Sequence, residues 1–330
     1  MSKHKKHSAH KTKRKNKKNF SVLLYVVLCL VVFWLAVGIY LFFNKTPASI
    51  YISSENPKQG DTVFIRVKSE ANSITGNFEN EKLVFYKKQN SNDWISLLGI
   101  DADQNPGNYK ISVDISSSEN LTKEINISLA DFSTEATVAA PSSQKTGITV
   151  EKAANNVRKN DNPSINKVLD NFTPQPYFAS SFSLPLNKIE KTGFSFGKFI
   201  GFAKDKLQHL GVDLKAPKDT DIFAINDGKV VATLNLSNYG KTIIIDHGLN
   251  IFSLYLHLDQ FKVFEGQMVS KGQIIGLSGE TGYVTGPHLH FSMRVGASRV
   301  DPIAFIETTQ KINDNFILAD ISNAFLNLLK

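Results

Sequence analysis

The sequence predicts a mostly β protein in which two β domains follow one apolar N-terminal segment. Three observations support this fold class. Residues 20–43 contain no charged side chain. Short apolar runs, many of them alternating and separated by turn residues, fill residues 48–132, and a second series fills residues 182–305. Runs of this kind between Gly, Pro, Asn and Asp clusters are typical of β-strands.

The positive charge of the chain lies in its N-terminal tail, residues 1–19. Nine of the 38 Lys and Arg residues fall within the first 18 residues, which leaves 29 basic against 30 acidic residues in the remainder. The net charge of +8 therefore belongs to a tail. We expect no domain that binds nucleic acid, because such domains are themselves basic.

The apolar segment of residues 20–43 predicts a transmembrane helix. At about 1.5 Å per residue it would cross a hydrocarbon core of about 30 Å. A cleaved signal peptide is the alternative, but its apolar region is shorter and ends in small residues. We expect an uncleaved signal anchor, with the basic tail in the cytoplasm and the later residues outside. The one cysteine, Cys29, lies within the segment, so no disulfide is expected outside the membrane.

The first β domain, residues 48–132, is expected to be an Ig-like β-sandwich. It contains no cluster of titratable side chains that suggests catalysis, so we interpret it as a spacer or binding module. Residues 133–181 are expected to form a linker that is helical in part, with Asn162-Pro163 interrupting any single helix.

The second β domain, residues 182–305, is expected to be followed by a C-terminal amphipathic helix, residues 306–330. In that last segment, apolar residues recur every three to four positions, which is the helical period.

The histidines are unevenly distributed. Three lie in the basic tail, at His4, His7 and His10, and are expected to have no specific role. The other five all lie in the second β domain: His209, His247, His257, His288 and His290.

Two short motifs in this domain suggest a metal site. "HLGVD" places His209 and Asp213 four residues apart, on a loop that leads into a short strand. "TGPHLHFSM" places His288 and His290 two residues apart on a strand, so both rings face the same side. A polar strand face with two solvated histidines is the alternative. Because a catalytic zinc takes three protein ligands and keeps one open position, His209, Asp213 and one histidine of the pair would complete such a site.

The segments "HLGVDLKAP", "YLHL" and "TGPHLHF" resemble the lysostaphin/LytM-type zinc endopeptidases, peptidoglycan hydrolases with a duplicated hybrid motif domain. The resemblance covers roughly residues 196–305. It implies an antiparallel β peptidase domain with one zinc per chain at the floor of a cleft. By position, His209, Asp213 and His290 match the zinc ligands, while His257 and His288 match the catalytic histidines.

Other positions differ from the family pattern or have no role in it. His247 matches no catalytic position and is expected to be structural. Ser292 stands where members usually carry Glu, and Gln208 where they often carry Arg. The loops at residues 235–240 and 278–286 are expected to form the walls of the cleft.

The resemblance implies a zinc-dependent endopeptidase that hydrolyses peptide cross-links of bacterial peptidoglycan. Its partners would be peptidoglycan stem or bridge peptides, the membrane, and division or wall-synthesis proteins. Its location would be the cytoplasmic membrane, with a single pass and the catalytic domain outside. Two alternatives stay open: a non-catalytic LytM-like regulator that binds the wall or activates an amidase, and a plain wall-binding module. The division of roles between His257 and His288 also stays open.

Overall fold

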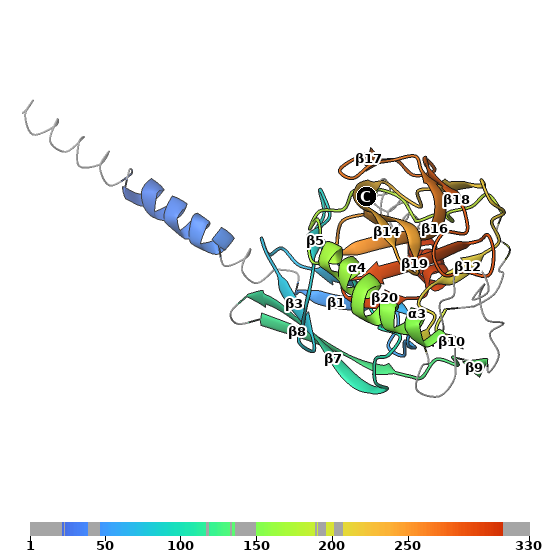
Figure 1. Ribbon diagram of the computed structural model, residues 1–330. Helices are drawn as coiled ribbons and strands as arrows, with labels where there is room; N and C mark the ends of the chain where they lie inside the picture. The colour runs from blue at the N-terminus through green and yellow to red at the C-terminus, as the bar shows by residue number, and fades with distance from the viewer. Residues whose placement is uncertain are drawn as a thin grey trace, which may run out of the picture. The chain divides into compact units, whose positions relative to one another are not determined.

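The computed structural model describes residues 22, 24–38, 47–116, 119–132, 134–135, 150–188, 190, 196–200 and 207–312 (Figure 1). The chain divides into two compact units, Met1–Pro47 and Ala48–Lys330.

In the first unit, residues 24–38 form a helix. Among the described residues, no helix has both the length and the hydrophobicity needed to cross a membrane. The described residues therefore do not support the predicted transmembrane helix. Residues 20, 21, 23 and 39–43 of the predicted segment lie outside the described residues, as does the basic tail.

The second unit begins with two four-stranded antiparallel sheets that enclose one core. The first has the order β1-β2-β6-β5, formed by β1 (Ser49–Ile52), β2 (Thr62–Lys68), β6 (Asp93–Gly99) and β5 (Tyr86–Lys87). The second has the order β4-β3-β7-β8, formed by β4 (Glu81–Leu83), β3 (Thr75–Phe78), β7 (Gly107–Ser116) and β8 (Glu119–Ile127). Alternate residues of β2 and β7 fill the space between the sheets, as period-two patterning requires. The Ig-like assignment of this sandwich stays a prediction.

A helical segment follows, made of α3 (Val150–Asn156), the π-helical turn η1 (Val157–Asp161) and α4 (Asn162–Leu169). The predicted interruption at Asn162-Pro163 is wrong: Asn162 keeps right-handed helical angles, φ −62° and ψ −45°, and Pro163 falls in the first turn of α4. Asn162 donates its backbone N–H to the Val157 carbonyl, five residues back. This wider turn and the missing N–H of proline together let the chain continue as helix.

The second β domain is built on a nine-stranded sheet with the central order β12-β19-β16-β15-β14-β17. Its strands are β12 (Val212–Leu214), β13 (Asp221–Phe223), β14 (Gly228–Leu236), β15 (Gly240–Asp246), β16 (Ile251–Phe261), β17 (Met268–Val269), β18 (Ile274–Ser278), β19 (Leu289–Val295) and β20 (Ser298–Val300). A small separate sheet joins β9 (Thr134–Glu135), β10 (Phe199–Ile200) and β11 (Leu207–Gln208). Only β9 and β10 pair in parallel among the described strands, which confirms a mostly antiparallel β fold.

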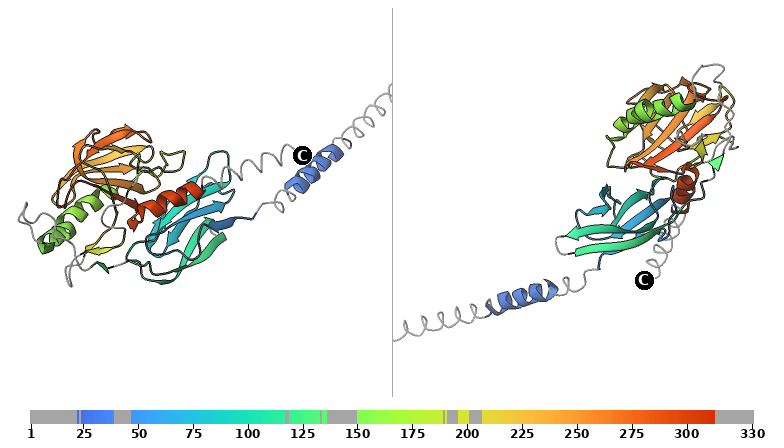
Figure 2. Two further views of the ribbon diagram at one scale, coloured as in Figure 1. Left: turned by 90° about the vertical axis from the view of Figure 1, so that its right-hand side faces the viewer. Right: turned by 60° about the horizontal axis from the view of Figure 1, so that its bottom comes forward.

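The central sheet has two differently covered faces. Leu289, Phe291 and Met293 of β19 point into the main core. On the other face of β16, Leu254 and Leu256 form a second core. Helix α4 covers this second core through its apolar residues Ile165 and Leu169, and Figure 2 shows the helix lying across the sheet. Because His290 alternates with Leu289 and Phe291, the histidine lies on the helix-covered face.

The residues that predicted the C-terminal helix by their spacing lie outside the described residues, and a helix is described just before them. Residues 302–312 are helical, and residues 313–330 lie outside the described residues, so the predicted helix over 306–330 stays a prediction. Asp301 Oδ1 accepts the backbone N–H groups of Ile303 and Ala304 at 2.8 and 3.3 Å, which caps the helix. Pro302 at the first helical position completes this start signal.

Candidate metal and catalytic site

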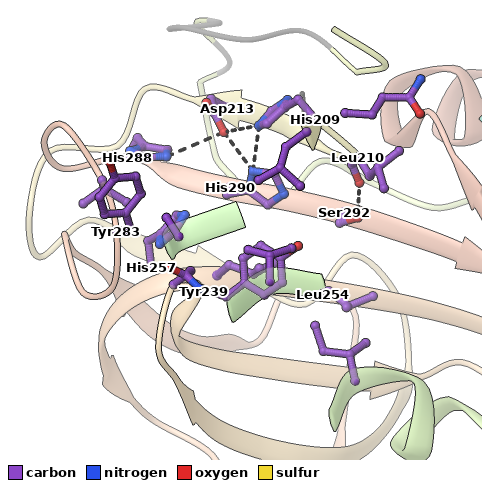
Figure 3. Close-up of a pocket in the computed structure, with 18 of the residues that line it drawn as sticks. His209, Leu210, Asp213, Tyr239, Leu254, His257, Tyr283, His288, His290 and Ser292 are labelled. Carbon is purple, nitrogen blue, oxygen red and sulfur yellow. Dashed lines mark hydrogen bonds and ion pairs between the residues drawn. The ribbon is translucent and has the colours of Figure 1, made fainter. Parts of the chain in front are cut away.

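Three side chains from two distant segments of the sequence meet at one edge of the central sheet. Asp213 on β12 lies directly opposite His290 on β19 in the antiparallel register. His209 follows β11 and reaches the same point. His209 Nε2 lies 3.0 Å from Asp213 Oδ1 and 2.9 Å from His290 Nδ1, and His290 Nδ1 lies 3.0 Å from Asp213 Oδ1 (Figure 3).

This triangle of atoms fits a zinc ion. Tetrahedral ligands at about 2.0–2.1 Å from zinc lie roughly 3.3 Å from one another, close to the separations found here. Two imidazole nitrogens and one carboxylate oxygen are also a donor set that zinc prefers. All three residues are buried or nearly so, and among the described residues they form a cluster of potential ligand atoms within 4.8 Å of one another.

The charge states suit metal binding. Burial alone would raise the pKa of Asp213, but the nearby His209 and His290 hold it well below its usual range. Burial, followed by the charge of His209, lowers the pKa of His290 to about 4. At neutral pH the carboxylate is therefore ionised and the imidazole of His290 neutral, which are the forms that bind a metal.

His257 and His288 lie beside this triangle. Their ring centroids are 5.0 Å apart, and His288 Nε2 lies 3.6 Å from Asp213 Oδ1. The strand period therefore does bring both histidines of "HLH" to one site (Figure 3). His257 lies on β16 where the pairing with β15 shifts register, and its φ is +63°. A non-glycine residue in this conformation at a bulge is costly, and bulges often redirect a side chain toward a site.

Backbone carbonyls orient both rings. His257 Nδ1 lies 2.9 Å from the Thr281 carbonyl oxygen, and His288 Nδ1 lies 2.8 Å from that of Gly286. A carbonyl only accepts, so each Nδ1 carries a hydrogen, and in a neutral ring Nε2 then keeps its lone pair. Burial, with smaller effects of His288 and His290, lowers the pKa of His257 to about 3, which keeps this ring neutral at pH 7. In the neutral form of either ring, Nε2 is the nitrogen that can accept a hydrogen bond.

The site opens into a cavity of about 200 Å³. Both predicted wall loops line it, through Asn238 and Tyr239 on one side and Tyr283 on the other. The Tyr239 ring stacks on that of His290, with centroids 6.4 Å apart and planes at 22°. These contacts bring the two loops to the site residues, as expected from the sequence.

The sequence did not reveal two further parts of the cavity. One is the helical segment 150–169, whose Ala153, Val157 and Ile165 line the cavity together with the site residues. The other is Arg294, which lines it from β19. Arg294 is in step with His288, His290 and Ser292, so strand alternation could have placed it on this face.

Ser292 and Gln208, which differ from the family pattern, each donate a hydrogen bond to a nearby backbone carbonyl. Ser292 Oγ donates a short hydrogen bond to the Leu210 carbonyl, which ties β19 to the loop between His209 and Asp213. Gln208 Nε2 donates to the Gly197 carbonyl at 3.2 Å. Neither side chain is a ligand in the triangle.

His247 is not part of this site. It is 0% exposed, with Nδ1 2.8 Å from the Asp227 carbonyl and Nε2 2.8 Å from Ser253 Oγ. Burial lowers its pKa to about 4. These contacts suit the structural role expected for it. His4, His7 and His10 lie outside the described residues.

Comparisons with known proteins find similarity in the same part of the chain. The model of peptidase family M23 matches residues 207–302. Peptidoglycan DD-endopeptidase ShyA of Vibrio cholerae is 47% identical over 87 residues, which are 26% of this chain and 20% of ShyA. DD-carboxypeptidase/endopeptidase Mpg of Neisseria meningitidis is 36% identical over 104 residues, 32% of this chain and 24% of Mpg. The chain thus spans about a quarter or less of the length of these two relatives.

A structural comparison extends beyond this domain. A crystal structure of a Pseudomonas aeruginosa protein described as a peptidase M23 superposes with a TM-score of 0.56 and 22% identity, and covers 76% of this chain and 95% of the other. At this identity the similarity shows a shared fold. The sequence match contains all five site residues, and residues 207–302 are a domain of peptidase family M23.

Proposed function

We propose that the chain is a zinc-dependent endopeptidase that hydrolyses peptide cross-links of bacterial peptidoglycan. The observation that carries this proposal is the convergence of His209 Nε2, Asp213 Oδ1 and His290 Nδ1 beside two histidines whose Nε2 atoms stay available. The relatives ShyA and Mpg, both named as endopeptidases, support the reaction class, and the name of ShyA supports the substrate class.

His209, Asp213 and His290 would hold the zinc. When bound, zinc lowers the pKa of a water molecule to about 7 and polarises a carbonyl group. His257 and His288 are the proton carriers of this proposal. Their Nδ1–H groups are held by backbone carbonyls, so each Nε2 can take a proton from the attacking water or return one to the leaving amine.

Two measurements on the full chain test the proposal together. Elemental analysis should give one zinc per chain, and mass spectrometry of purified peptidoglycan after digestion should show cleaved cross-links. Asp213→Ala should lose both zinc and cleavage, because it removes the one anionic ligand. A zinc-loaded chain that leaves purified peptidoglycan intact would contradict the proposal and favour the regulator or wall-binding alternative.

We also propose that residues 20–43 anchor the chain in the cytoplasmic membrane, with the M23 domain outside and peptidoglycan and wall-synthesis or division proteins as its partners. The charge-free segment after nine basic residues supports this topology. Protease added to intact spheroplasts should digest residues 48–330 and spare a tag at the N-terminus. A mature chain that starts near residue 46 would instead indicate a cleaved signal peptide.

A further inference from the structure

Arg294 is a cation in the cavity of the candidate site that the proposed chemistry does not use. It lies on β19 four residues after His290, and both side chains line the same cavity. At about 3.3 Å per residue, the two positions are roughly 13 Å apart along the strand. Only 7% of Arg294 is exposed. A charged side chain that is this deeply buried is normally paired with an opposite charge.

No such partner is present in the described part of the chain. The structure gives the guanidinium no hydrogen bond or ion pair there, and its Nη1 is buried without an acceptor. Burial, followed by the nearby charge of Arg299, lowers the pKa of Arg294 to about 10, so the group still carries its charge at neutral pH. An unpaired buried cation of this kind lowers stability, and such costs are typical of binding sites.

The neighbouring acids are already engaged. Arg299 lies directly opposite Arg294 on β20, and it binds Asp101 through Nε at 2.9 Å and Asp103 through Nη2 at 2.6 Å. Asp161 accepts hydrogen bonds from the loop of residues 237–239. Two like charges therefore face each other across the strand pair, and only Arg299 is neutralised. Among the described residues, no neighbouring acid is left to accept from Arg294, so a bound ligand can supply the acceptor.

The surroundings define the chemistry of that acceptor. Apolar side chains, among them Val157, Ile165 and Leu254, line the same cavity, and they strengthen a charge interaction by excluding water. A guanidinium binds a carboxylate through two parallel N–H···O bonds, a geometry that a lone ammonium does not offer. An extended peptide advances about 3.3–3.6 Å per residue, so about four residues reach from the metal triangle to Arg294.

We propose that Arg294 binds a carboxylate of the substrate peptide, within about four residues of the bond that is cut, and so selects acidic over amidated peptides. The proposal rests on the endopeptidase function proposed above. It assigns to Arg294 a role in specificity, separate from metal binding and from proton transfer.

The test uses synthetic cross-linked peptides that contain the cleavable amide and differ only in their carboxylates. One peptide keeps every carboxylate, one has the terminal carboxylate as an amide, and one has the side-chain carboxylate as an amide. The zinc-loaded full chain is compared with Arg294→Met, Arg294→Lys and the control Lys229→Met, which removes an exposed charge on β14. kcat/KM is measured for each peptide, and calorimetry with the zinc-free proteins measures binding without turnover.

For wild type and Lys229→Met, kcat/KM should be about 10- to 100-fold lower for one of the two amidated peptides than for the peptide that keeps every carboxylate. This is the scale of a hydrogen bond to a charged group. Arg294→Met should lose this preference through a higher KM for the peptides that keep the bound carboxylate. Arg294→Lys should keep part of the preference, because it keeps the charge and loses the two-pronged geometry. The amide that abolishes the preference identifies which carboxylate is bound.

Three results would overturn the proposal: no preference in wild type, an equal loss on all peptides in Arg294→Met, or acetate alone binding Arg294 as tightly as the peptide does. If Arg294→Met does not fold, a full preference retained by Arg294→Lys would overturn it as well. If no peptide is cut although zinc is bound, the endopeptidase function fails, and the calorimetric comparison still decides whether Arg294 selects a carboxylate.

Discussion

Asp213 and His290 face each other across strands β12 and β19, with Oδ1 and Nδ1 3.0 Å apart. Strand register therefore positions two of the three candidate ligands. A slip of one residue would turn one of them to the opposite face. Gly211, in the loop before β12, packs directly against this pair. A Cβ at this position would lie 2.6 Å from His290 Nε2 and 2.6 Å from the Phe291 carbonyl oxygen, which is too close for a side chain.

Gly211→Ala should therefore displace the His290 ring and weaken zinc binding. The Phe291 carbonyl belongs to the backbone and cannot move aside, so the ring and strand β12 have to shift. We expect at least a tenfold weaker affinity in a chelator competition assay, and a loss of about 1–3 kcal/mol in the free energy of unfolding. Gly286→Ala is the matched control, because a Cβ there meets no atom within 4 Å. Equal zinc affinity in both variants would contradict this packing argument.

His257→Ala and His288→Ala should keep zinc and lose turnover. Three ligands are already supplied, and a catalytic zinc keeps its fourth position open. Each variant should retain about one zinc per chain and hydrolyse peptidoglycan peptides at least about 10²-fold more slowly, the scale of a lost proton-transfer group. The double variant should lose less than the product of the single losses if the two rings act together.

Zinc analysis on the same preparations is the control for these variants. Loss of zinc in His288→Ala would mean that the roles within "HLH" are exchanged and that His290 is the free base. A turnover close to that of wild type in either variant would remove that ring from the proposed proton transfer.

His247 should make stability depend on pH. Its pKa is lowered to about 4 by burial, while an unfolded histidine titrates near 6.5. Below pH 6.5 the unfolded chain binds a proton that the folded chain does not, so stability should fall as the pH drops from 6.5 toward 4. The slope from this residue should be about 1.4 kcal/mol per pH unit. His247→Asn should show a shallower slope in denaturant titrations over this range, and an unchanged slope would contradict the assignment.

The candidate site could be predicted from the sequence to the extent that it depends on local periodicity. Two histidines at period two have to share a strand face, and the spacing of "HLGVD" leads from a loop into a strand. The triangle of His209, Asp213 and His290 follows from pairing these two segments.

The rest depends on contacts between distant segments, which local patterns do not encode. Nothing near Arg294 in sequence shows that Asp101 and Asp103 bind Arg299 and leave Arg294 unpaired. The rule that proline ends a helix was misleading at Pro163, because the π-helical turn before it supplies the room that the ring needs. The covering of the sheet by α4 also depends on tertiary packing of Ile165 and Leu169.

Asp161 links this helical segment to the wall of the cavity. It is 1% exposed, and its carboxylate accepts the backbone N–H groups of Ser237, Asn238 and Tyr239 at 3.3, 2.8 and 3.3 Å. The Tyr239 hydroxyl donates to Asn162 Oδ1 at 3.0 Å. The carboxylate also accepts Asn238 Nδ2–H at 3.2 Å, so it satisfies three backbone donors and one side-chain donor of the loop whose Tyr239 stacks on His290.

Asp161→Ala should release this loop and destabilise the domain. Three backbone N–H groups and the Asn238 side-chain amide would lose their acceptor, and each buried unsatisfied donor costs about 1–3 kcal/mol. Because water can enter and satisfy some of them, we expect a total loss of about 2–4 kcal/mol in the free energy of unfolding. Hydrogen exchange at residues 237–239 should accelerate, while exchange in β16 should change less. Asp170→Ala, at the exposed end of α4, is the control and should alter neither measurement. Loop protection equal to wild type in Asp161→Ala would show that packing of Ile165 and Leu169 alone holds the helix, and that the carboxylate does not order this side of the cavity.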